Sequence, residues 1–159
     1  MDPIRQFEKE RHARIEQQQS DADFQKLSQS WLLDSMARQY VYNFEWMGRP
    51  IIQYPQDMVA VQELIWSVKP DVIIETGIAH GGSLILSASM LALLDYCEAL
   101  AEGTLLDPSN PKRYVVGVDI DIREHNLKSL QSHPMANRLH LLEGSSIDAA
   151  TVGRVTDLV

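Results

Sequence analysis

Three short apolar runs, each followed by a turn and a helical pattern, dominate the second half of the chain. They are VIIE at 72–75, YVVGV at 114–118 and LHLLE at 139–143. Continuous apolar runs of this length are typical of strands that a parallel sheet buries on both faces. Strands that alternate with helices predict an α/β fold with right-handed crossovers.

Three helical patterns separate and follow these runs. The segment SLILSASMLALLDYCEAL after the first strand predicts a long apolar helix, and a Pro- and Asn-containing loop follows it at 102–113. After the second strand, Asp121 and Glu124 have the spacing of a capping box, and Pro134 marks the end of that helix. A last helix is expected near 147–157, where Asp148 is interpreted as a carboxylate at the helix start.

The first 70 residues are expected to form a helical N-terminal extension, and residues 71–159 a sheet domain. Residues 3–20 are charged and Gln-rich, which fits either a solvated helix or a disordered arm. An amphipathic helix is predicted from Asp23, capped by Asp21 or Asp23, and another over 55–68. The aromatic stretch between them is interpreted as a loop or a short extended link. Trp31, Phe44 and Trp46 fit plain packing better than an acceptor pocket or a subunit contact.

Composition narrows the classes of partner. The net charge of −8 argues against a nucleic-acid backbone or an anionic membrane surface as partner. No stretch is judged to approach the roughly 20 apolar residues of a membrane span, so a cytoplasmic location is expected. The single cysteine, Cys97, is expected to be a small buried hydrophobe. His125, His133 and His140 share no metal-ligand spacing.

The nine residues ETGIAHGGS at 75–83 directly follow the first predicted strand. In open α/β sheets, ligands bind at the carboxyl ends of the strands, where a strand turns into its helix. Gly77 can adopt backbone angles closed to other residues, while Gly81 and Gly82 are expected to let the main chain approach a ligand. A tight turn without any ligand is the alternative.

The spacing of the turn selects among nucleotide-like ligands. The dinucleotide pattern G-x-G-x-x-G is absent, and Glu75 precedes the first glycine. A carboxylate there would repel a pyrophosphate but would suit a ligand with an ammonium group. Asp119, at the end of the second strand, could accept hydrogen bonds from two ribose hydroxyls. S-adenosylmethionine (SAM), an amino acid joined to a nucleoside without phosphates, satisfies both carboxylates.

These residues resemble the cofactor half of class I methyltransferases. The strings NFEWMGRPIIQYPQDM, ETGIAHGGSLI, GVDIDIREHN and LLEGSSID more narrowly resemble the cephalosporin hydroxylase family, which includes rhamnosyl O-methyltransferases. The resemblance covers about residues 22–150 and implies strands 1–3 of a Rossmann-like parallel sheet. It also implies methyl transfer from SAM to a small-molecule or glycan hydroxyl, a homo-oligomer, and Mg²⁺ held by residues beyond this chain.

Residue by residue, the resemblance places a cofactor-binding set on this chain. Its members lie on the glycine turn, at the end of the second strand and in the turn that edges the adenine: Glu75, Gly77, His80, Gly81, Gly82, Ser83, Asp119, Ser145 and Ser146. His80 could instead be exposed on the loop. Two features depart from the family: the separation from Gly81 to Asp119 is longer than usual, and serine stands where many methyltransferases have aspartate.

The resemblance also implies that a complete enzyme of this class has about four more strands after the third, and that these later strands carry the metal ligands and the catalytic base. No catalytic residue is therefore named, and the chain is expected to be a fragment of a protein of roughly 230 to 250 residues. The first strand would then leave an apolar sheet edge open. Two other functions stay open, namely an NAD-dependent oxidoreductase and a truncated non-catalytic module for cofactor binding or assembly.

Overall fold

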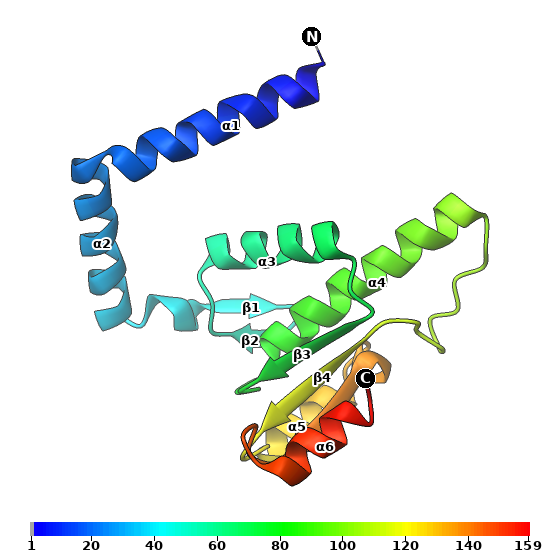
Figure 1. The fold of residues 1–159 in the computed structure, drawn as a ribbon. Coiled ribbons are helices and arrows are strands. Elements are labelled where there is room, and N and C mark those ends of the chain that lie inside the picture. The colour runs from blue at the N-terminus through cyan, green and yellow to red at the C-terminus, as the bar shows by residue number, and fades with distance from the viewer. Residues whose placement is uncertain (1) are drawn as a thin grey trace. The chain divides into compact units, whose positions relative to one another are not determined.

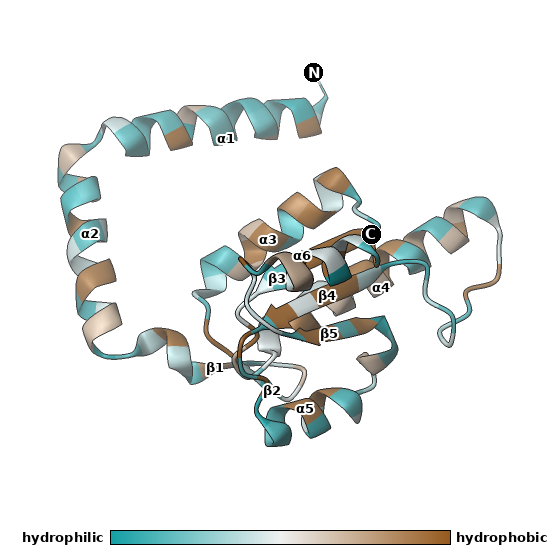
Figure 2. Ribbon diagram, turned by 60° about the horizontal axis from the view of Figure 1, so that its bottom comes forward, coloured by the Kyte–Doolittle hydropathy of each residue, from teal (hydrophilic) through white to brown (hydrophobic). Residues whose placement is uncertain are grey.

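The computed structural model describes residues 2–159 and contains two compact units, one that extends to Tyr40 and one from Val41 to Val159 (Figure 1). The first unit consists of helices α1 (Pro3–Ser20) and α2 (Ala22–Ala37). Each begins with an aspartate cap: the Asp2 carboxylate accepts from the Ile4 N–H at 3.0 Å, and that of Asp21 from the Phe24 N–H at 2.9 Å. Helix α1 is mostly hydrophilic (Figure 2), so residues 3–20 form the solvated helix that the sequence offered as one possibility.

The second unit is built on a parallel sheet of three strands. Strands β3 (Val72–Thr76), β4 (Tyr114–Asp119) and β5 (Leu139–Glu143) lie in the order β3-β4-β5. Val72 pairs with Tyr114, and Val115 pairs with Leu139. The expected strands are confirmed to within one residue at each end, and the α/β fold with a partial Rossmann-like sheet is confirmed with them.

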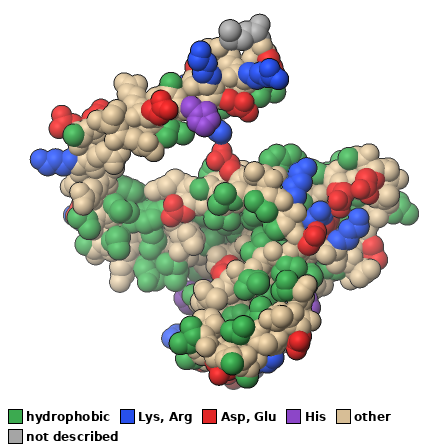
Figure 3. Space-filling model, in the orientation of Figure 1, with side chains coloured by type: hydrophobic (Ala, Val, Ile, Leu, Met, Phe, Trp, Pro, Cys, Tyr) green, Lys and Arg blue, Asp and Glu red, His purple; other side chains and the backbone are tan. Residues whose placement is uncertain are grey.

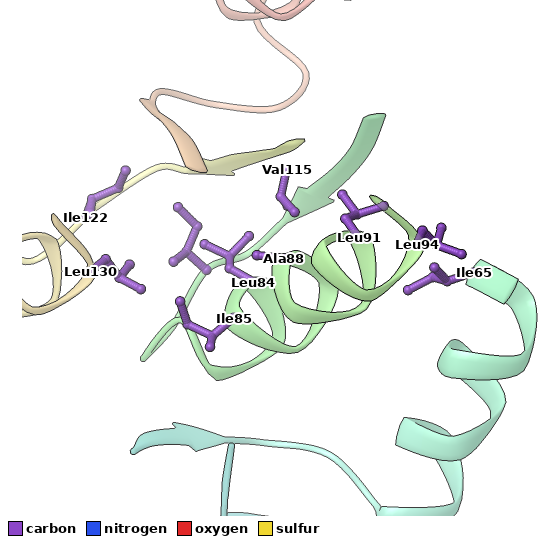
Figure 4. Close-up of a cluster of buried hydrophobic side chains, with 10 residues drawn as sticks. Ile65, Leu84, Ile85, Ala88, Leu91, Leu94, Val115, Ile122 and Leu130 are labelled. Carbon is purple, nitrogen blue, oxygen red and sulfur yellow. The ribbon is translucent and has the colours of Figure 1, made fainter. Parts of the chain in front are cut away.

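Helix α4 (Gly82–Glu102) carries the hydrophobic core of this unit. Leu84, Ile85 and Leu91 are fully buried on it, and Figure 4 shows them along α4 in a cluster that also contains Val115 of β4 and Ile65 near the end of α3 (Pro55–Val68). Helix α5 (Glu124–Gln131) adds the buried Leu130, and the short η2 (Ala136–Arg138) and α6 (Ala149–Thr156) flank β5 in the sequence. Five of the ten buried residues of the core cluster lie on α4, so burial of this face supplies much of the apolar stabilisation of the unit.

Helix α4 is also the one helix in residues 2–159 that is long and apolar enough to span a membrane by length and composition. The expectation that no stretch comes near this limit is therefore wrong for α4. In the structure, half of its apolar window is buried against the rest of the protein. Core helices of globular domains meet the same criterion, because both environments exclude water.

The stretch expected to be a loop or an extended link forms a β-hairpin instead. After a 3₁₀ turn, η1 (Tyr40–Asn43), strands β1 (Phe44–Trp46) and β2 (Arg49–Ile51) pair antiparallel. The two turn residues, Met47 and Gly48, both have positive φ, at 46° and 79°, as a two-residue hairpin requires. Trp46 donates from its indole nitrogen to the Ser89 hydroxyl at 3.0 Å, which fastens the hairpin to α4.

Three local expectations have mixed outcomes. Asp148 caps α6 as expected, accepting from the N–H groups of Ala150 and Thr151. Asp121 does not cap α5, because the cap position is Arg123 and no side chain bonds there. Cys97 is exposed rather than buried, since it lies on the face of α4 that turns away from the core. Apolar residues on the β3 edge and on α3 are exposed too, among them Ile74 at 51% and Trp66 at 54%, and Figure 3 shows such hydrophobic side chains at the surface.

A buried ion cluster joins α4 to the sheet. The Asp95 carboxylate accepts from Arg113 at 2.5 Å and from Arg138 at 2.6 Å, and all three side chains are at least nine-tenths buried. Arg113 also bonds Glu98, which keeps the pKa of Arg113 above and the pKa of Glu98 below their ordinary values. Asp95 is the most buried carboxylate of the cluster: it is the carboxylate paired with Arg138, while Arg113 shares its charge between Asp95 and Glu98.

Replacing Asp95 with Asn is expected to lower the free energy of unfolding by about 3–5 kcal/mol, since the buried Arg138 loses its countercharge and Arg113 keeps only the more exposed Glu98 as a close partner. Urea denaturation followed by tryptophan fluorescence measures the change. The matched control is Glu98→Gln, at a more exposed member of the same cluster, for which a much smaller loss is expected. Equal losses in the two variants would show that the buried carboxylate has no special role.

Candidate functional site

A cavity of about 290 Å³ opens at the carboxyl end of β3. One wall is the segment from Glu75 to Ser83. The opposite wall comes from the hairpin, the link after it and α3, through Pro50, Ile52, Gln53, Met58 and Val61. The cavity therefore lies where the sequence predicted a ligand, and its volume is close to the lower end of the range for small-molecule sites.

The turn between β3 and α4 has an unusual backbone. Gly77, Ala79 and Gly81 all have positive φ, at 84°, 47° and 80°. Ala79 is the costly one, because a side chain disfavours this conformation, and such residues persist only where their surroundings enforce it. A Cβ on Gly77 would meet nothing within 4 Å, so this glycine faces open space at the cavity wall.

Gly81 and Gly82 are needed for a reason other than the expected one. A Cβ on Gly81 would lie 2.5 Å from the Leu130 side chain, and a Cβ on Gly82 would lie 2.3 Å from the Pro50 carbonyl oxygen. The missing side chains therefore admit α5 and the hairpin, which are parts of the protein itself. Both glycines also line the cavity, so their approach to a ligand stays a prediction, while Gly77 has open space at its Cβ position.

Glu75 belongs to the cavity wall and holds the start of α4. Its carboxylate accepts a hydrogen bond from the Ser83 hydroxyl. Burial raises the pKa of Glu75 above its ordinary value, and the bond from Ser83 offsets this only in part. A half-buried carboxylate without a cationic partner in the described residues is thus available to a cation in the cavity.

Asp119 supports the same turn from the side of β4. One carboxylate oxygen accepts from the Ile78 N–H at 2.7 Å and the Ala79 N–H at 3.4 Å, and the other accepts from the Asp121 N–H at 3.1 Å. Burial alone would raise the pKa of Asp119, but the backbone donors outweigh burial and lower it. Asp119 does not line the cavity, so the two carboxylates that the sequence paired meet the turn from different sides.

Two residues that the sequence did not single out, Arg49 and Asn126, bind the carbonyl groups of Ala79 and His80 in the turn. Arg49 donates from Nε and Nη2 to the His80 carbonyl at 3.0 and 2.6 Å, and from Nη2 to the Asn126 side-chain oxygen at 3.0 Å. Asn126 donates in turn to the Ala79 carbonyl at 2.9 Å. The residues lie 31 to 77 positions apart, so no local pattern could have revealed them.

The predicted cofactor-binding residues fall into two groups. One cavity is lined by six of them: Glu75, Gly77, His80, Gly81, Gly82 and Ser83. The others lie at the tips of β4 and β5 and do not line it: Asp119, Ser145 and Ser146. The two tips are joined, because the Gly144 N–H donates to the Asp119 carbonyl at 2.8 Å.

Metal ligands are not gathered in this part of the protein. Residues 2–159 contain no group of three His, Cys, Asp or Glu side chains that could hold a metal ion. His133 and His140 have other contacts: the His133 ring is 3.0 Å from the Met47 carbonyl, and the His140 ring packs edge-on against Tyr114 at 4.9 Å.

The sheet, the glycine turn and the carboxylates on two adjacent strands define a Rossmann-like half domain with a ligand cavity at its carboxyl edge. Residues 38–159 match the family model described as rhamnosyl O-methyltransferase/CmcI. The chain belongs to this family, which confirms the resemblance seen in the sequence. No curated protein matches the chain.

Similar solved structures include three of CmcI. The structure with SAH is 18% identical, covers 71% of this chain and 52% of its own, and has a TM-score of 0.42. The apo structure is 19% identical, and the match covers 71% of this chain and 40% of that structure's chain. The structure with Mg-SAM is 20% identical, and the match covers 70% of this chain and 40% of that structure's chain. Both have a TM-score of 0.46. This chain spans about half the length of these structures or less.

Replacing Gly82 with Ala is expected to lower the free energy of unfolding by about 1–3 kcal/mol, because the new Cβ would collide with the backbone of β2. Thermal and urea unfolding measure the change. Gly153→Ala is the matched control, since it lies inside helix α6 and its Cβ would meet open space. It should stabilise by about 0.5–1 kcal/mol. A harmless Gly82→Ala would mean that the hairpin is not packed on α4 as described.

Proposed function

We propose that this chain is the cofactor-binding part of a SAM-dependent O-methyltransferase that acts on a glycan or natural-product hydroxyl. One observation carries the proposal beyond the family: a half-buried carboxylate, Glu75, lines the cavity beside a glycine turn with open space at Gly77. This combination suits an amino-acid ammonium group and disfavours a pyrophosphate.

The proposed ligand would be held by complementary charges and by backbone groups. Its ammonium group would lie near Glu75, where it would replace water as the partner of a half-buried charge. The first N–H groups of α4, from Gly82 onward, lack acceptors inside the helix and suit the carboxylate of the amino acid. The ammonium group of the ligand would thus meet the Glu75 carboxylate, and the carboxylate of the ligand would meet the N–H groups at the start of α4.

Asp119 is proposed to bind the ribose while it holds the turn. Each carboxylate oxygen can accept two hydrogen bonds. The oxygen that accepts from the Asp121 N–H at 3.1 Å is the one proposed to accept a ribose hydroxyl as well. Ser145 and Ser146, in the turn tied to the tip of β4, are proposed to edge the adenine.

When bound, SAM supplies an electrophilic methyl group, and the residues of this chain would orient it toward the acceptor hydroxyl. Positioning of this kind supplies much of the rate in group transfer. The description of one CmcI structure with Mg-SAM supports a role for Mg²⁺. With no three-ligand group in residues 2–159, we propose that its ligands lie outside this chain.

Replacing Asp119 with Ala is expected to weaken the binding of S-adenosylhomocysteine by about 1–3 kcal/mol, because polar partners lose their match. Calorimetry measures the change. Asp121→Ala, at an exposed carboxylate two residues away, is the control and should bind as the wild type does. Asp119→Asn keeps an oxygen for the Ile78 N–H and so separates ribose binding from support of the turn. Wild type that binds NAD but not S-adenosylhomocysteine would instead favour an oxidoreductase.

The binding of S-adenosylhomocysteine should weaken as the pH falls through the raised pKa of Glu75, because the protonated carboxyl no longer attracts the ammonium group. Glu75→Gln should bind more weakly and lose this pH dependence. In the absence of ligand the sign is opposite: ionising Glu75 costs stability, so stability due to this group declines as the pH rises from the unfolded-state pKa through the folded one. Titration calorimetry of wild type and Glu75→Gln across pH measures the binding, and thermal unfolding of the ligand-free proteins across pH measures the stability.

The control for this pH series is Glu124→Gln, at an exposed carboxylate paired with Lys128. It should keep the wild-type pH profile. An unchanged profile in Glu75→Gln would rule out Glu75 as the partner of the ammonium group.

A further inference from the structure

We propose that Arg49 and Asn126 are positioning residues for the cofactor: they hold the glycine turn in its binding conformation without touching the ligand. This inference rests on the proposed function of the cavity. It assigns a role in binding to the β1-β2 hairpin and to α5, two elements outside the glycine turn itself.

We call the hydrogen bonds of Arg49 and Asn126 to the glycine turn the clamp. The geometry of the peptide bond links this clamp to the cavity. In a trans peptide, the C=O and the N–H point in opposite directions, and the chain contains no cis peptide. The Ala79 carbonyl is held by Asn126, so the N–H of His80 in the same peptide unit points away from Asn126. None of the described residues 2–159 accepts a hydrogen bond from this N–H, and His80 lines the cavity.

The clamp also holds Ala79 in its strained backbone conformation. Ala79 at φ 47° would relax toward negative φ if it were free. Its carbonyl is held by Asn126, its N–H contacts the Asp119 carboxylate, and the next carbonyl receives two bonds from Arg49. These four hydrogen bonds reach three successive peptide units, from Ile78–Ala79 to His80–Gly81, and they fix the direction of each peptide plane.

Arginine is required at position 49 for its shape. Its planar fork bonds the His80 carbonyl and the Asn126 oxygen together, whereas a lysine ammonium is a point charge on a flexible stem. Asn126 is 4% exposed and uses both ends of its amide, accepting from Arg49 and donating to Ala79. An aspartate there keeps the acceptor but loses the donor.

Two variants of the full chain test the proposal. Arg49→Lys and Asn126→Asp are each expected to raise the Kd for S-adenosylhomocysteine at least tenfold, measured by calorimetry at a temperature where denaturation shows the variant folded. Amide hydrogen exchange at residues 78–83 should accelerate in both, while exchange in β4 stays as in wild type. The matched controls are Arg123→Lys and Asn137→Asp, both at exposed positions, which should change neither quantity.

The outcomes separate the two proposals. Should wild type bind no S-adenosylhomocysteine, the proposed function fails, and the exchange measurement still tests whether the clamp holds the turn. If wild type binds and a folded variant binds equally well, the positioning role is wrong, even where the variant is less stable. Since Asn126→Asp removes a single donor, it remains informative if Arg49→Lys does not fold.

Discussion

The candidate site depends on hydrogen bonds that hold the peptide planes of one short turn. From Gly77 to Gly81 the chain takes three left-handed conformations, and within the turn only the Gly81 N–H, which donates to the Ile78 carbonyl at 2.8 Å, bridges the strained Ala79. Compensation comes from Asp119 on β4, Arg49 on β2 and Asn126 on α5. Each comes from a different element, so the turn has its conformation only when the whole second unit is folded.

Two polar systems thus stabilise opposite ends of the same sheet. The Asp95 cluster ties α4 to β4 and η2, while the turn network ties the start of α4 to the carboxyl ends of the strands. Between them lies the apolar face of α4 (Figure 4). The apolar composition that makes α4 resemble a membrane helix is also what buries it in the core. Because α4 is buried in this way, its N-terminus is held at the cavity wall.

The parallel strands and the position of the ligand site could be predicted because both follow from local patterns: apolar runs such as VIIE and glycines directly after them. The hairpin could not, since its three-residue strands are too short to alternate and its turn places Met47 at positive φ. The packing role of Gly81 and Gly82 could not be predicted because their neighbours, Leu130 and Pro50, come from distant segments. Arg49 and Asn126 were missed for the same physical reason.

The close approach of Gly82 to β2 has a mechanical consequence. The Pro50 carbonyl lies against this glycine, Trp46 is bonded to Ser89, and Arg49 is bonded to His80. These three contacts join the hairpin to the glycine turn and to α4, so the hairpin and the turn form one connected wall of the cavity. The wall formed by Met58 and Val61 of α3 takes no part in these contacts, so the shape of the cavity is set on one side by polar and backbone contacts and on the other by apolar side chains.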